Sequence, residues 1–138
     1  MHSVTQTRNP LFFTAITINA VFSILCGLVM AATPAAVAGW LGITRTADVV
    51  AIGLFLLGFA GFLLWVRWRG SIAAPLAWGI VLGDLGWVVF SAMLLGGFSQ
   101  HFSGPGLWLI VDVALLVGLF AGLQARGLLR PRGELQPG

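Results

Sequence analysis

The chain consists mainly of four long apolar runs, separated by short joints that contain arginine, proline or glycine. Each run is close to the about 20 residues that an α-helix needs to cross about 30 Å of hydrocarbon. We therefore predict an all-α membrane protein: a transmembrane four-helix bundle of up-down-up-down topology with short connections. The predicted spans are residues 11–32, 47–65, 73–95 and 107–123.

The pattern leaves room for one transmembrane domain and two short tails. We place this domain at residues 11–125, after an amino-terminal tail of residues 1–10 and before a basic tail of residues 126–138. The first run follows Asn9-Pro10 and matches the other three in length, so we expect it to be a retained span rather than a cleaved signal peptide.

The two joints on the predicted outer side differ from each other. Residues 33–46 are too apolar for a solvated loop, and Pro34 suits the first turn of a helix. We predict a short helix lying in the membrane interface and anchored by Trp40. Residues 96–106 contain four glycines and a proline, which predicts a flexible turn.

Arginine is distributed unevenly between the two ends of the runs. Six of the seven arginines fall on one side, and only Arg45 falls on the other. The positive-inside rule then predicts that both termini lie in the cytoplasm. Tryptophan and arginine near the run ends are the expected interfacial anchors, namely Trp40, Trp65, Trp68, Trp108, Arg67, Arg69, Arg126 and Arg130.

Small residues recur at helical spacing on three of the runs. Lipid tails give helices no hydrophobic reason to associate, so close packing through small side chains indicates contact faces. We expect these faces to form the bundle core or, alternatively, contacts between copies of the chain. The predicted packing residues are Ala15, Ser23 and Gly27 on the first run, Gly79, Gly83 and Gly86 on the third, and Ala114, Gly118 and Gly122 on the fourth.

Two carboxyl groups, those of Asp84 and Asp112, lie inside the predicted spans away from the span ends, whereas Asp48 lies at the start of the second span. An aspartate at the centre of a span costs roughly 2.5 to 3.5 kcal/mol, so each should face the bundle interior, water or a partner. The spans contain no lysine, arginine or histidine as a counter-ion, so we expect neutral, hydrogen-bonding acids. The predicted polar cluster comprises Asp84, Asp112, Asn19, Ser91 and Trp87. We interpret this polar cluster as structural, with hydrogen bonds that hold the helices together. A proton or cation relay and contact with another membrane protein are the alternatives.

Cysteine, histidine and charge exclude several classes of function. The single cysteine, Cys26, has no partner for a disulfide or thiolate site, and the two histidines lie outside the spans. We therefore predict no metal, no cofactor and no enzymatic activity. The net charge of +3 comes from arginines at helix ends, which favours membrane lipids as partners rather than nucleic acid.

Several segments together are similar to a loose group of small bacterial four-helix membrane proteins of unknown function. The segments are Thr33 to Ile43, Leu63 to Arg67, Gly83-Asp84-Leu85-Gly86-Trp87-Val88, and Gly122-Leu123-Gln124-Ala125-Arg126-Gly127-Leu128. The resemblance covers roughly residues 11 to 130. It implies a bacterial inner-membrane protein and transfers no activity. Asp112 matches no feature of that group.

Size, glycine-rich faces and the lack of a catalytic set favour a non-enzymatic protein of the bacterial inner membrane. We expect it to act through helix–helix contacts, as an accessory subunit of a membrane complex or as a small homo-oligomer. The alternative is a small proton- or cation-coupled transporter or channel that uses Asp84 and Asp112. A polar route reaching both membrane surfaces would favour that alternative.

Overall fold

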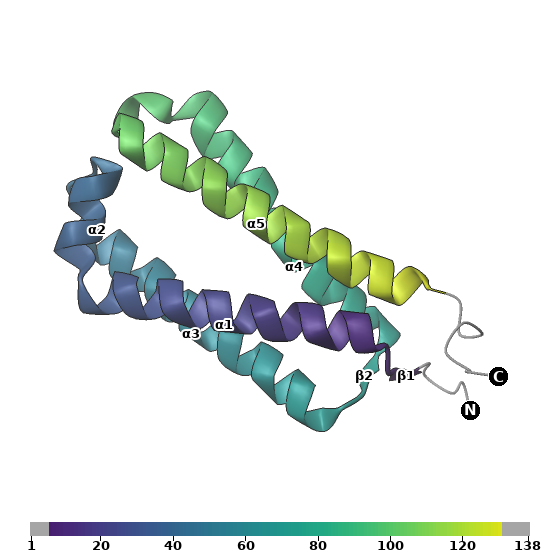
Figure 1. The fold of residues 1–138 in the computed structure, drawn as a ribbon. Coiled ribbons are helices and arrows are strands. Elements are labelled where there is room, and N and C mark those ends of the chain that lie inside the picture. Colours follow the sequence, from purple (N-terminus) through teal and green to yellow (C-terminus); the bar gives the residue numbers. More distant parts are fainter. Residues whose placement is uncertain (1–5, 131–138) are drawn as a thin grey trace.

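The computed structural model describes residues 6–130, which form four long helices and one short one (Figure 1). The long helices are α1 (Pro10–Ala32), α3 (Thr46–Arg69), α4 (Ala74–Gly97) and α5 (Gly104–Leu129). Each is long and apolar enough to cross a membrane. The prediction of an all-α membrane protein with four spans is therefore confirmed.

Local signals in the sequence define several helix ends. The Asn9 side chain accepts a hydrogen bond from the Phe12 backbone N–H and caps α1, and Pro10 occupies the first turn. The next span, α3, ends at its carboxyl side before Gly70. This residue adopts a left-handed conformation with φ of 68° that glycine accommodates easily.

The last helix is longer than the apolar run predicts, because α5 begins at Gly104 and continues to Leu129. At its start, the Ser103 hydroxyl accepts a hydrogen bond from the Gly106 N–H, so a helix cap stands where we predicted a flexible turn. Ser99–His101 form a short 3-10 helix in the same joint. Arg126 therefore lies on the helix instead of in a separate tail.

The long helices form two hairpins, one of α1 and α3 and the other of α4 and α5, joined by packing of α1 on α5. Figure 1 shows the two hairpins with the start of α1 and the end of α5 at one end of the bundle and α2 (Pro34–Leu41) at the other. We name these the terminal end and the α2 end. At the terminal end, β1 (Gln6–Thr7) and β2 (Ile72–Ala73) pair antiparallel.

The hydrophobic core is small and lies between α1, α3 and the start of α4. Phe12 and Leu63 are fully buried there. Many large apolar side chains instead face outward along the helices, among them Phe55, Leu82, Val89, Met93 and Leu115, each at least 59% exposed. Such continuous apolar exposure is unusual for a water-soluble protein and suits contact with lipid chains.

The short helix α2 ties the two hairpins together at their far end. Gly42 ends α2 in a left-handed conformation with φ of 78°. The Ser103 backbone N–H then donates to the Leu41 carbonyl at 2.9 Å, and its hydroxyl donates to the Trp40 carbonyl. The cap of α5 thus satisfies carbonyl groups at the end of α2, which the helix itself leaves without partners.

Candidate functional site

A carboxyl group held by two amides lies where three helices meet. One oxygen of Asp84 on α4 accepts a hydrogen bond from the Asn19 amide on α1 at 2.8 Å and another from the Gln124 amide on α5 at 2.8 Å. All three side chains are buried, with Asp84 4% exposed. We name Asn19, Asp84 and Gln124 the amide–carboxyl cluster.

Each member of the cluster belongs to the buried strip of its own helix. On α4 this strip is Ala77, Ile80, Val81, Asp84 and Ser91, and on α5 it includes Val117, Phe120, Ala121, Gln124 and Gly127. Residues three and four apart share a helix face, so these strips aim the polar groups inward. The cluster extends one turn along α1, where the Ser23 hydroxyl donates to the side-chain amide oxygen of Asn19 at 3.3 Å.

Asp112 does not join this cluster. It precedes Gln124 by twelve residues, which corresponds to about 18 Å along α5 toward the α2 end, and it is exposed. We expected both carboxyls in one polar cluster, because the fourth span runs opposite to the third and this brings Asp112 to within about a turn of Asp84 in depth. The helix instead continues to Leu129, and Gln124 takes the place next to Asp84.

Ser91 lies on the α4 strip and Trp87 lies beside it, and neither side chain forms a hydrogen bond with the Asp84 carboxyl. The Ser91 hydroxyl donates to the Trp87 backbone carbonyl at 2.9 Å. The Trp87 indole N–H is buried and has no hydrogen-bond partner among the described residues. The amide oxygen of Gln124 is also without a partner there.

The glycines of α4 face away from the bundle, which differs from our expectation. A methyl group added at Gly79, Gly83 or Gly86 would meet no atom within 4 Å. Successive helix positions are 100° apart, so Gly83 lies a quarter turn from Asp84, and Gly79 and Gly86 lie farther round. Because Asp84 turns inward, these glycines point outward.

The predicted small residues of the other two helices divide between buried and open positions. Ala15, Ser23 and Gly27 on α1 are buried. On α5, Ala114 and Gly118 are half-buried, and a methyl group at Gly118 would lie 3.7 Å from Val88 on α4. Gly122 is exposed and has open space around it.

Tight contacts occur at glycines that the sequence did not single out. Gly53 on α3 faces Gly27, Gly106 on α5 lies against the Leu41 backbone, and Gly127 lies against the Phe12 N–H. At each of these positions a methyl group would lie within 3.0 Å of a backbone atom, so only glycine allows the observed approach.

The expected anchor residues are exposed at the helix ends. Trp68 and Trp108 are 82% and 71% exposed, and Trp40 and Trp65 are also exposed. Arg67 lies over the Phe13 ring at 5.9 Å, and Arg69 lies over the Trp65 ring at 5.2 Å. Arg126 and Arg130 are exposed at the terminal end of α5. These positions suit contacts with lipid headgroups.

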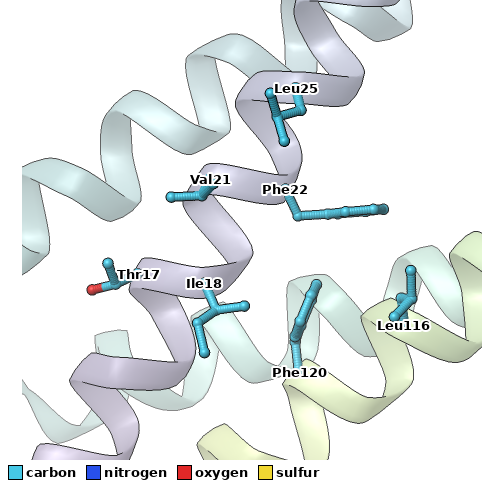
Figure 2. Close-up of a pocket in the computed structure, with 7 residues that line it drawn as sticks. All are labelled: Thr17, Ile18, Val21, Phe22, Leu25, Leu116 and Phe120. Carbon is cyan, nitrogen blue, oxygen red and sulfur yellow. The ribbon is translucent and has the colours of Figure 1, made fainter.

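A groove of about 410 Å³ runs between α1 and α5 on the outside of the bundle (Figure 2). The Phe22 and Phe120 rings meet there edge to face, with centroids 5.7 Å apart. The one polar lining side chain, Thr17, donates its hydroxyl to the Phe13 carbonyl of its own helix. The groove is lined by Thr17, Ile18, Val21, Phe22, Leu25, Leu116 and Phe120, so its surface suits hydrocarbon.

Gln124 is the site residue that sequence reasoning missed. It lies seven residues after Val117, on the same strip, so the helical spacing contained the signal. The predicted span ends at residue 123, so Gln124 lies just outside it.

The amide–carboxyl cluster and the Ser23 hydroxyl beside it form a set suited to hydrogen bonding between helices. Within residues 6–130, no three histidine, cysteine or acidic residues lie together in a way that would hold a metal ion. Comparison of the chain with models of protein families, with curated proteins and with solved structures gives no match. The resemblance to small bacterial membrane proteins therefore stays a prediction.

Proposed function

We propose that this chain is a non-enzymatic protein of the bacterial inner membrane that acts through helix–helix contacts. It serves as an accessory subunit of a membrane complex or as a small homo-oligomer, with both termini in the cytoplasm. Its other partners are membrane lipids, and it does not bind nucleic acid.

The observation that carries the proposal is the internal pairing of Asp84. Two amides from two other helices donate to it, so its burial is accounted for by hydrogen bonds that hold α1, α4 and α5 together. The carboxyl group therefore has a structural role that needs no transported ion. Among the residues that the structure describes, five polar side chains are buried, namely Asn19, Ser23, Asp84, Ser91 and Gln124.

The outward faces supply the contact surface. The α4 helix packs mainly on α5, so much of its surface is open. Gly79, Gly83 and Gly86 leave room for the backbone of a neighbouring helix to approach closely, as small residues do at helix contacts in membranes.

Native mass spectrometry after gentle detergent extraction tests the proposal. We expect an oligomer of the chain or a complex with a co-purifying membrane protein. A strictly monomeric species that carries no other protein, both in detergent and in lipid nanodiscs, would refute it.

A further inference from the structure

Asp112 is the one charged side chain in residues 6–130 that is exposed within a span and lies at least two turns from both ends of its helix. It lies eight residues after the start of α5 and one turn beyond Trp108. No hydrogen bond or ion pair joins its carboxyl to another described residue. Hydrocarbon is a costly environment for such a group, so its position calls for a partner from outside the chain.

Asp112 belongs to a continuous outward face of α5. Val117, Phe120 and Ala121 mark the buried face, and the opposite face carries two leucines that are 68% and 56% exposed, Leu115 and Leu119. Residues three and four apart lie on the same side of any helix, so this spacing identifies the face but does not by itself indicate a partner. The residues of this α5 face are Trp108, Asp112, Leu115, Leu119, Gly122 and Arg126.

We propose that the α5 face binds a second copy of this chain, with the two α5 helices parallel around a two-fold axis along the membrane normal. The two Asp112 carboxyl groups then hydrogen-bond to each other across the axis. This inference rests on the proposed function, because it names the partner and the surface for a contact protein.

Symmetry favours a second copy over a different partner. Two copies of a chain insert in the same orientation, so a two-fold axis brings Asp112 of each to the same depth. A protonated carboxyl group donates one hydrogen bond and accepts another, which makes it complementary to itself. A single polar position of this kind also sets the register of two parallel helices.

The rest of the α5 face suits the same arrangement. Leu115 and Leu119 pack next to the carboxyl pair, and Gly122 lets the two backbones approach. Arg126 lies near the terminal end, where its long side chain reaches lipid headgroups instead of its counterpart. The packing of Phe120 on Phe22 lies on another side of the helix and is left intact.

Cysteine cross-linking in native membranes tests the contact. In a Cys26→Ser background, Leu115→Cys should give a disulfide-linked dimer of the chain on mild oxidation. Leu54→Cys, a similarly exposed leucine on α3, is the matched control and should remain monomeric. A Leu115→Cys variant that links to a protein of another size, or that links no better than Leu54→Cys, overturns the proposal.

Substitution of Asp112 tests the hydrogen bond. Asp112→Asn keeps a side chain that both donates and accepts, so self-association measured by energy transfer in diluted bilayers should stay within about threefold of the original. Asp112→Leu removes the bond and should weaken association by roughly 3- to 30-fold. Equal association of the Leu variant and the original chain contradicts the proposed carboxyl pair.

The two proposals fail in different ways. If native mass spectrometry shows an oligomer or complex but Leu115→Cys does not link copies of the chain, the α5 contact is wrong and the contact function stands. If the protein is strictly monomeric and alone, both proposals are wrong.

Discussion

Gly27 on α1 and Gly53 on α3 face each other so closely that neither position has room for a side chain. A methyl group at Gly27 would lie 2.8 Å from the Gly53 carbonyl oxygen, and one at Gly53 would lie 3.0 Å from the Gly27 carbonyl oxygen. This contact sets the distance between the two helices of the first hairpin.

We therefore expect Gly27→Ala to destabilise the bundle by about 1 to 3 kcal/mol, because the backbones must move apart. Gly58→Ala on α3, where an added methyl group would meet no atom within 4 Å, is the matched control. It should be neutral or stabilising by up to about 1 kcal/mol, since alanine favours a helix. Unfolding in mixed micelles measures both variants, and equal destabilisation would show that the Gly27 contact is not tight.

The sequence predicted the architecture because length and hydropathy alone decide which segments span a membrane. The sequence predicted less clearly which face of α4 turns toward the bundle. Asp84 and the glycines lie on different faces of the helix, and each favours turning inward. The cost of an aspartate in lipid exceeds what close glycine packing contributes, so the carboxyl decides the rotation. Residues 79–86 alone are enough to compare these two free-energy terms.

Predicting the partner of Asp84 required knowing where α5 ends, and the apolar run alone does not define that end. Arg126 indicated a boundary near residue 123, yet the helix continues to Leu129. Gly127 packs against the first turn of α1 and belongs to this added segment. This tertiary contact joins residues more than 100 positions apart, which periodicity within one run does not reveal.

Membrane orientation is predicted from the arginine asymmetry. In a Cys26→Ser background, Ser99→Cys at the α2 end should react with a membrane-impermeant thiol reagent in intact cells, and Ser71→Cys at the terminal end should not. Both cysteines should react after the cells are opened, which controls for access. Labelling of Ser71→Cys alone in intact cells would reverse the predicted orientation.

Gln124 and Asp84 should be energetically coupled. Gln124→Leu removes one of the two donors to the carboxyl and should cost about 1 to 2 kcal/mol of unfolding free energy. In the double variant with Asp84→Leu, the second substitution should cost less than it does alone, because the bond is already lost. A double-mutant cycle measures the coupling, and additive effects would mean that the 2.8 Å contact contributes nothing to stability.

Substitutions of Asp84 distinguish a structural role of its carboxyl group from a role in a proton or cation relay. Asp84→Asn keeps an oxygen that accepts from Asn19 and Gln124, so the protein should remain folded with nearly unchanged stability. Asp84→Leu leaves both amides without an acceptor and should destabilise the bundle by roughly 1 to 3 kcal/mol.

Thermal unfolding and ion flux in reconstituted vesicles, measured on the same preparations, distinguish the two roles. The structural role predicts no proton or cation flux in the original chain, and it predicts that only Asp84→Leu changes stability. A relay predicts flux in the original chain and none in a folded Asp84→Asn variant, because asparagine does not take up and release a proton. A stable Asn variant that loses an existing flux would overturn the structural interpretation of the amide–carboxyl cluster.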